Sequence, residues 1–95
     1  MRAFRRLIEA IEAEGSAALV TLARVEGSSP RDAGARMVVR PSGGFHGTIG
    51  GGTLEFVALE AASEALRKGG DQRGVVRLRL GPSLASAAAA VSNGD

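Results

Sequence analysis

The sequence predicts a single small α/β domain, with helices packed on a mixed sheet of about four strands. Three observations support this fold class. An apolar run at residues 17–25 indicates a buried strand, and two short β-like segments at 36–40 and 45–49 indicate a hairpin. A helical pattern from Leu54 onward then leads into an alternating apolar segment that ends at Leu80. With 95 residues, the chain has room for one modest hydrophobic core.

The chain is expected to begin with an amphipathic helix that ends before a buried strand. Four apolar residues fall at i, i+3, i+4 and i+7 and form one stripe: Phe4, Leu7, Ile8 and Ile11. Gly15 stands where a glycine commonly ends a helix. The run Ala17–Val25 is then nearly continuous in apolar residues, which favours a strand covered on both faces.

The middle of the chain predicts a hairpin followed by a β-α-β crossover. Pro41-Ser42-Gly43-Gly44 indicates the turn of an antiparallel hairpin. The second helix begins near Leu54 and ends at Arg67-Lys68-Gly69-Gly70, where cations precede glycines. The alternating segment that ends at Leu80 predicts a strand with one solvated face, at or near a sheet edge. The hairpin's second strand, the helix and this strand together form the crossover.

The C-terminal segment differs from the rest in composition. Ser83 is a candidate N-cap for a short helix from Leu84 to Val91, but six of those residues are Ala or Ser and offer little to bury. The final Ser-Asn-Gly-Asp is expected to fray. Residues 1–84 are therefore expected to form the domain and residues 85–95 an Ala-rich tail.

Composition excludes several classes of protein. Twelve Lys and Arg residues against ten Asp and Glu give a formal charge of +2, and no basic run carries interleaved aromatic residues, so a nucleic-acid binder is not indicated. The chain has no cysteine, which excludes disulfides, thiolate metal sites and a Cys nucleophile. No apolar stretch approaches membrane-spanning length, and acidic residues interrupt the basic N-terminus. A cytoplasmic protein without membrane contact is expected.

Two glycine-bearing segments are candidates for an anion-binding site. Their proposed ligand contacts are Gly27, Ser28, Ser29 and Arg31 in the first, and Gly50, Gly51, Gly52 and Thr53 in the second. Consecutive glycines before a helix let backbone N–H groups converge, and the helix N-terminus adds a positive potential. The amides from Gly51 to Thr53, with the Thr53 hydroxyl, are expected to hold a phosphate. Ordinary turn geometry is the alternative interpretation of both segments.

Three further side chains have both structural and functional interpretations. Arg36 points into a cleft or lies on the solvated face of its strand. Glu55 is favourable beside a helix N-terminus on electrostatic grounds alone, although it would also suit a ligand amino group. His46, the sole histidine, is expected to be structural. A Ser-His-Asp hydrolase is a distant alternative, because nothing resembles a nucleophile elbow.

Two long motifs resemble a known family. The first is Ala18–Met37, which contains Val25–Arg31 and Gly34–Met37, and the second is Phe45–Glu55. Together they resemble the N-terminal domain of the XdhC/CoxI family, whose members are accessory proteins of molybdenum hydroxylases. The resemblance covers roughly residues 1–84. It implies a non-enzymatic protein that binds molybdenum cofactor (molybdopterin), supports its sulfuration and delivers it to an apo hydroxylase of xanthine dehydrogenase or carbon monoxide dehydrogenase type. A cysteine desulfurase is a further implied partner.

The chain departs from the family pattern at one place. The family commonly continues with Gly-Gln-Cys-Cys-Gly-Gly after the segment like Leu80–Leu84, where this chain has Ala85-Ser86-Ala87-Ala88-Ala89-Ala90. A non-catalytic interaction module that has lost cofactor binding therefore stays open as the alternative. Members also commonly carry a Rossmann-like C-terminal domain, so this chain is a single-domain member or a fragment. A homodimer stays open as well, because a solvated edge strand favours pairing.

Overall fold

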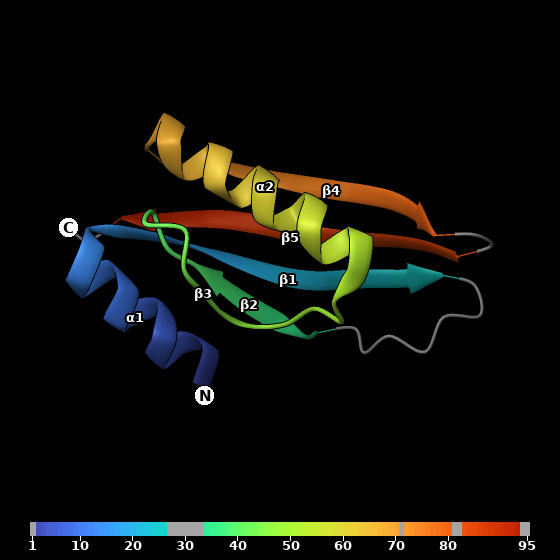
Figure 1. Ribbon diagram of the computed structural model, residues 1–95, viewed down its shortest axis with the longest axis horizontal. Helices are drawn as coiled ribbons and strands as arrows, with labels where there is room; N and C mark the ends of the chain where they lie inside the picture. The colour runs from blue at the N-terminus through green and yellow to red at the C-terminus, as the bar shows by residue number, and fades with distance from the viewer. Residues whose placement is uncertain (1, 27–33, 71, 81–82, 94–95) are drawn as a thin grey trace.

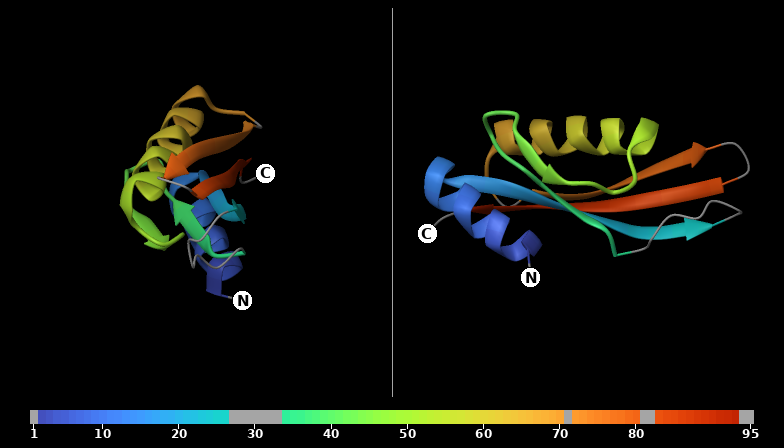
Figure 2. Two further views of the ribbon diagram at one scale, coloured as in Figure 1. Left: turned by 90° about the vertical axis from the view of Figure 1, so that its right-hand side faces the viewer. Right: turned by 60° about the horizontal axis from the view of Figure 1, so that its bottom comes forward.

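The computed structural model describes residues 2–26, 34–70, 72–80 and 83–93. In these residues the elements follow the order α1 (Arg2–Glu14), β1 (Ser16–Glu26), β2 (Arg36–Val39), β3 (Phe45–Gly47), α2 (Gly52–Lys68), β4 (Arg73–Leu80) and β5 (Ser83–Asn93). The strands form one sheet in the order β3-β2-β1-β5-β4, and α1 and α2 pack on opposite faces (Figures 1 and 2). The predicted α/β fold class is confirmed, but the sheet is antiparallel throughout the described strands rather than mixed.

Strand β1 occupies the centre of the sheet, and its N-terminal part is covered on both faces as the apolar run predicts, whereas Ala23 farther along is exposed. Val20 and Leu22 belong to the larger core cluster, which also contains Leu54 of α2. Ala17 belongs to a second cluster on the other face, together with Leu7 of α1. Because neighbouring residues of a strand point to opposite faces, one nearly continuous apolar strand supplies both cores.

The predicted antiparallel hairpin is confirmed. Met37 pairs with Gly47 and Val39 with Phe45 across β2 and β3. The turn is closed by the Arg40 amide, which donates to the Gly44 carbonyl at 2.8 Å. Strand β3 is shorter than the sequence predicts, because the chain leaves the sheet after Gly47 and turns toward α2.

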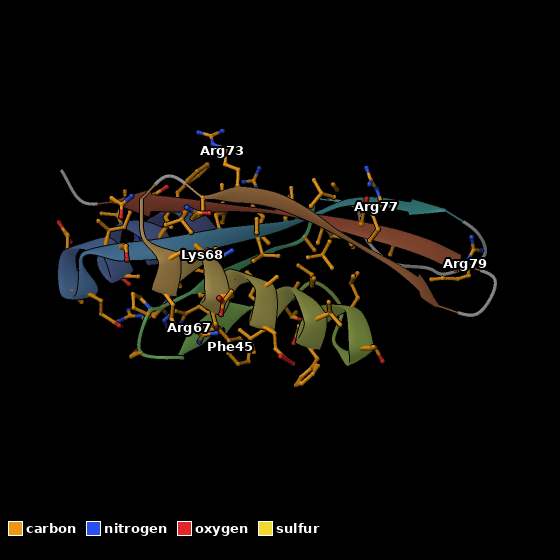
Figure 3. The ribbon with its side chains drawn as sticks, turned by 90° about the horizontal axis from the view of Figure 1, so that it is seen from above. Phe45, Arg67, Lys68, Arg73, Arg77 and Arg79 are labelled. Atoms are coloured by element: carbon orange, nitrogen blue, oxygen red, sulfur yellow. The ribbon has the colours of Figure 1, made fainter. Side chains whose placement is uncertain are left out.

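Helix α2 carries the chain from β3 at one sheet edge to β4 at the other, which confirms the predicted crossover (Figure 1). Each neighbouring pair of strands is antiparallel, so β3 and β4 run parallel to each other without touching. The edge position of β4 also agrees with its alternating sequence. Arg73 and Arg77 project from the side of β4 away from α2 (Figure 3).

The C-terminal segment is a strand, which corrects the helix expected from Leu84 to Val91 and the frayed Ala-rich tail. Strand β5 lies between β1 and β4 and is paired along nearly its whole length with both. Ala85 and Ala87 are buried under α2, beside Ala58 and Ala62. Small side chains on both elements let the helix approach the sheet closely. The expected boundary after residue 84 falls inside this strand, and the described chain has five strands rather than about four.

Helix α1 buries only part of its predicted apolar stripe. Leu7 is buried with Ala10, whereas Phe4 is 45% exposed and Ile8 56% exposed. The apolar stripe that the sequence predicts is therefore only partly buried. The helix ends as predicted: Gly15 has φ 87° and its amide donates to the Ile11 carbonyl at 2.7 Å.

The C-terminal end of α1 is tied to the β2–β3 turn through one carboxylate. Glu14 accepts hydrogen bonds from the Ser42 amide at 2.9 Å and hydroxyl at 3.1 Å, and lies 3.3 Å from Arg40 Nη1. Desolvation raises the pKa of Glu14, but the bonds from Ser42 and the nearby Arg40 outweigh it, so the pKa lies below its ordinary value of 4.5. The charged form is therefore the one the folded state favours.

The contacts of Glu14 with Ser42 and Arg40 predict that folding stability depends on pH. Because the folded-state pKa of Glu14 is lowered, its contribution to stability is present above pH 4.5 and is lost as the pH falls through the folded pKa. We expect the Glu14→Gln variant to lose less unfolding free energy than the wild type over that acidic interval in urea titrations. Ser42→Ala should reduce the effect in part, and identical pH slopes for Glu14→Gln and the wild type would contradict the assignment.

Neither helix in the described residues is long and apolar enough to cross a membrane.

Candidate functional site

The most unusual backbone in the described chain is the glycine corner, Gly50–Gly52, between β3 and α2. These glycines have φ values of 114°, 74° and 72°. Residues with a side chain rarely adopt such angles, so the chain needs glycine at three consecutive positions to enter α2 this way. The corner leads directly into a 17-residue helix whose N-terminus carries a partial positive charge.

A carboxylate from the first turn of α2 already lies on the corner. Glu55 Oε1 accepts hydrogen bonds from the amides of Ile49 at 3.0 Å and Gly51 at 3.1 Å, and from the Thr48 hydroxyl. The Gly50 amide donates to the Thr48 Oγ1 at 3.0 Å. The Gly51 amide, expected from the sequence to bind a ligand phosphate, is thus used inside the protein.

The corner amides that follow are exposed. Gly52 and Thr53 occupy the first turn of α2, where backbone N–H groups have no intrahelical acceptor. Within the described residues, neither amide has a hydrogen-bond acceptor. An anion at this helix end would therefore meet the amides of Gly52 and Thr53, because Glu55 already accepts from the Gly51 amide.

Glu55 should make a measurable contribution to folding stability. Its replacement by Ala leaves the Ile49 and Gly51 amides without this acceptor, and we expect a loss of about 1.5–3 kcal/mol in the free energy of unfolding. Glu55→Gln keeps one oxygen acceptor but no charge, so its loss should be smaller, about 1 kcal/mol. Urea unfolding followed by circular dichroism measures both, and an unchanged Glu55→Ala protein would contradict the contacts.

The first predicted segment, with Gly27, Ser28, Ser29 and Arg31, lies outside the described residues. The chain on either side of it is placed, however. The Gly34 amide donates to the Leu22 carbonyl at 2.7 Å, and the Leu22 amide donates to the Ala35 carbonyl at 2.8 Å. The end of β1 and the start of β2 lie at the same end of the sheet as the N-terminus of α2 (Figure 1).

Arg36 begins β2 and is half-buried on the α1 side of the sheet. Its guanidinium carbon lies 5.3 Å from the centroid of the Phe4 ring, a cation–π contact. Its Nε is buried and has no hydrogen-bond partner among the residues that the structure describes. The sequence left open whether Arg36 faces a cleft, and the structure answers this: it lines a pocket.

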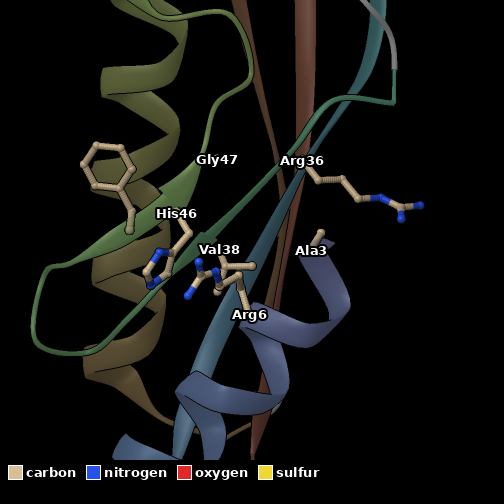
Figure 4. A pocket seen from close by; sticks show the side chains of 7 residues that line it. Ala3, Arg6, Arg36, Val38, His46 and Gly47 are labelled. Atoms are coloured by element: carbon tan, nitrogen blue, oxygen red, sulfur yellow. The ribbon is translucent and has the colours of Figure 1, made fainter. Parts of the chain in front are cut away.

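We call this cavity the hairpin pocket. It has a volume of about 610 Å³ and is lined by Ala3, Arg6, Arg36, Val38, Phe45, His46 and Gly47. In Figure 4, Arg6 extends from α1 toward the strand that carries His46, while Arg36 projects from β2. Sequence reasoning did not assign Arg6 to any site, because only the packing of α1 against the hairpin brings it near His46.

Within the described ranges, no three His, Cys, Asp or Glu side chains are grouped as metal ligands. The features of the described residues that would attract an anion at these two places are the N-terminus of α2 and the arginines Arg6 and Arg36.

These observations define a small α/β domain with a glycine-built helix N-terminus and an arginine-lined pocket, and comparison with known proteins gives its family. The chain belongs to the XdhC and CoxI family, whose model matches residues 10–79. The resemblance inferred from the sequence motifs is thereby confirmed.

The chain is also similar to one curated protein and to one solved structure. Over 68 residues the chain is 38% identical to the molybdenum cofactor insertion chaperone PaoD of Escherichia coli (strain K12), a match that covers 72% of this chain and 21% of PaoD. A crystal structure of a xanthine dehydrogenase from Bacillus halodurans shares the fold with a TM-score of 0.65, over 94% of this chain and 30% of that one, at 23% identity. The chain thus spans a minor part of the length of either relative.

Proposed function

We propose that this domain binds molybdenum cofactor and takes part in its insertion into an apo molybdenum hydroxylase, of xanthine dehydrogenase or carbon monoxide dehydrogenase type. Family membership supports the proposal, as does the similarity to a protein named a molybdenum cofactor insertion chaperone. The role is to hold and present the cofactor, without turnover of a substrate. Support of sulfuration, with a cysteine desulfurase as partner, and a cytoplasmic location belong to the same proposal.

The observation that carries the proposed site is the carboxylate of Glu55 on the glycine corner. Backbone donors that converge on the Glu55 carboxylate support the proposal that this loop accommodates an anion, and the helix dipole acts in the same direction. In this proposal Gly50, Gly51 and Glu55 build the corner, while the exposed amides of Gly52 and Thr53 meet the cofactor phosphate.

The rest of the proposed site comes from the same end of the sheet. Arg36, whose side chain lies on the α1 side of the sheet at this end, is a further proposed contact, because its planar guanidinium suits an anion. Gly27, Ser28, Ser29 and Arg31 complete the proposed contacts from the segment that joins β1 to β2. A homodimer is also part of the proposal: the edge strand β4 of one copy would pair with β4 of the other, which would satisfy backbone groups that an edge strand leaves unpaired.

A titration with molybdopterin tests the function. We expect saturable binding by the wild-type chain, weakened about tenfold in Thr53→Pro, which removes a backbone donor at a helix position that tolerates proline. Thr53→Ala keeps the amide and is the matched control for the loss of the side chain. Capture of a hydroxylase by a chain that binds no molybdopterin would contradict the proposal and favour the interaction module.

A further inference from the structure

We infer that the uncovered half of the sheet is a docking surface for an amphipathic helix of another protein, one with an apolar stripe and an acidic flank. The surface lies on β4 and β5, on the side away from α2, and we call it the open face. Its described side chains are Arg73, Val75 and Arg77 of β4 and Ser86, Ala88 and Ala90 of β5. This inference goes beyond the proposed function and does not depend on cofactor binding.

The two helices leave the open face uncovered. Ala85 and Ala87 of β5 belong to the core cluster that contains Leu54 of α2, so the residues that alternate with them point to the other side. On that side, the cluster beneath α1 has members from α1, β1 and β2, and none from the described residues of β5 or β4. Strands β1 and β4 are two strand spacings apart, about 10 Å, which is close to the diameter of a helix. One further helix therefore fits beside α1, where it would complete the second layer on this side of the sheet.

Exposed apolar side chains border the open face. Val75 on β4 and Ile8 on α1 are both 56% exposed. Ile8 stands about 200° around the helix axis from Arg6, which extends toward the strand of His46, so Ile8 lies on the flank of α1 nearer β5. Phe4 is 45% exposed and shares that flank, because it precedes Ile8 by one helical turn. Apolar groups gathered around one exposed surface are typical of a protein interaction site.

The strand register places these apolar groups at one level of the sheet. Ala88 lies opposite Val75 on one side and Thr21 on the other. Thr21 in turn lies opposite Arg36, and the Arg36 guanidinium contacts the Phe4 ring. Phe4 and Val75 therefore lie on either side of Ala88, and the apolar stripe of a helix placed over Ala88 would meet both.

The charges of the open face indicate an acidic partner. Arg73, Arg77 and Arg79 alternate along β4 and are exposed, and the first two project away from α2 in Figure 3. Neither β4 nor β5 contains Asp or Glu, and these arginines make no ion pair in the described part of the chain. Their spacings along the strand, about 7 and 13 Å, suit carboxylates one and two turns apart on a helix, about 5 and 11 Å.

Other partners match this surface less well. Neither strand carries an aromatic residue on which a nucleic acid base could stack. The alanines at the centre of the open face give a lipid bilayer little apolar surface to bury. Pairing of β4 edges in the proposed homodimer runs in the plane of the sheet, so it leaves the open face free.

Selection from a library of displayed helical peptides tests the inference. Each peptide has about 18 residues and is about 27 Å long as a helix, which matches the eight residues of β4. One stripe is fixed as Leu and Ala, and the flanking positions vary among Glu, Gln and Lys. We expect the peptides enriched on the purified chain to carry Glu along one flank, and their fluorescein-labelled forms to bind saturably in fluorescence anisotropy. Enrichment of Lys, or no saturable binding, would overturn the inference.

Two variants of Val75 form a matched pair. Val75→Glu places a carboxylate between Arg73 and Arg77 on the same face, and we expect it to weaken binding of an enriched peptide at least about tenfold. Val75→Gln has nearly the same size without the charge and should weaken binding only about two- to threefold. Because Val75 is exposed, both variants should keep the circular dichroism of the wild type. Equal losses in the two variants would show that charge does not guide the docking.

Two arginine variants separate the open face from general charge attraction. Arg77→Gln should weaken peptide binding about two- to fivefold, the scale of one exposed ion pair. Arg67→Gln removes the same charge from an exposed site on α2, on the other side of the sheet, and should change the dissociation constant by less than about twofold. Amide NMR shifts caused by the peptide should centre on Val75, Arg77 and Ala88. Equal effects of the two variants, or shifts centred on α2, would contradict the inference.

Co-sedimentation with phosphatidylglycerol vesicles tests the membrane alternative. We expect the wild-type chain to remain in the supernatant, because the open face lacks large apolar groups at its centre. Vesicle binding that Val75→Glu abolishes and that an enriched peptide does not block would assign the open face to a lipid surface instead.

Discussion

Gly47→Ala should be among the most destabilising single changes in the hairpin, with an expected loss of about 2–4 kcal/mol in the free energy of unfolding. Two costs combine. Gly47 has φ 85°, which disfavours any side chain, and an added Cβ would lie 2.6 Å from the Arg36 carbonyl oxygen. That oxygen is backbone in the paired strand β2, so relief requires the hairpin to separate. Urea unfolding monitored by far-UV circular dichroism measures the loss.

Gly43→Ala is the control that separates the two costs. Gly43 has φ 102°, but a methyl group added there would meet no atom within 4 Å, so only the backbone cost of about 1–2 kcal/mol applies. Equal losses in the two variants would show that the close approach of β2 and β3 does not exist in solution.

Leu54→Ala should remove a large share of the domain's stability. Leu54 is fully buried and joins the core cluster with Val20 and Ile49. Truncation of a buried leucine costs about 2–5 kcal/mol, against a total of about 5–15 kcal/mol for a typical domain. We therefore expect a much lower urea midpoint and a partly unfolded population at 37 °C.

The control for Leu54→Ala lies on the exposed side of the same helix. Phe56 is 61% exposed, so Phe56→Ala removes more atoms but should change the free energy of unfolding by about 0.5 kcal/mol or less. A Phe56→Ala loss as large as that of Leu54→Ala would mean that α2 packs on the sheet through a different face.

Sequence patterns predict most of the fold, because α1, β1, the hairpin, α2 and β4 each follow a clear local rule. Strand β5 is the exception. Alanine has a high helix propensity, and the run Ala85–Ala90 offers no alternation of large and small residues. Its strand conformation comes from pairing on both sides with β1 and β4, and from the small space beneath α2. Neither cause can be detected within the segment itself.

The candidate site is less predictable for a similar reason. The sequence identifies the glycine corner and places Glu55 in the first helical turn. Only the folded loop shows that the Glu55 carboxylate accepts hydrogen bonds from the Ile49 and Gly51 amides. The amides left for a ligand are then those of Gly52 and Thr53. The hairpin pocket requires α1 and β3 to meet, which is a long-range contact that local patterns do not encode.

The most direct test of the cofactor-binding role is calorimetric titration of the purified chain with molybdopterin, compared with Thr53→Pro and Thr53→Ala. We predict saturable binding that Thr53→Pro weakens and Thr53→Ala largely keeps. A wild-type chain that is folded and yet releases no heat of binding, and retains no molybdopterin in equilibrium dialysis, would contradict the account.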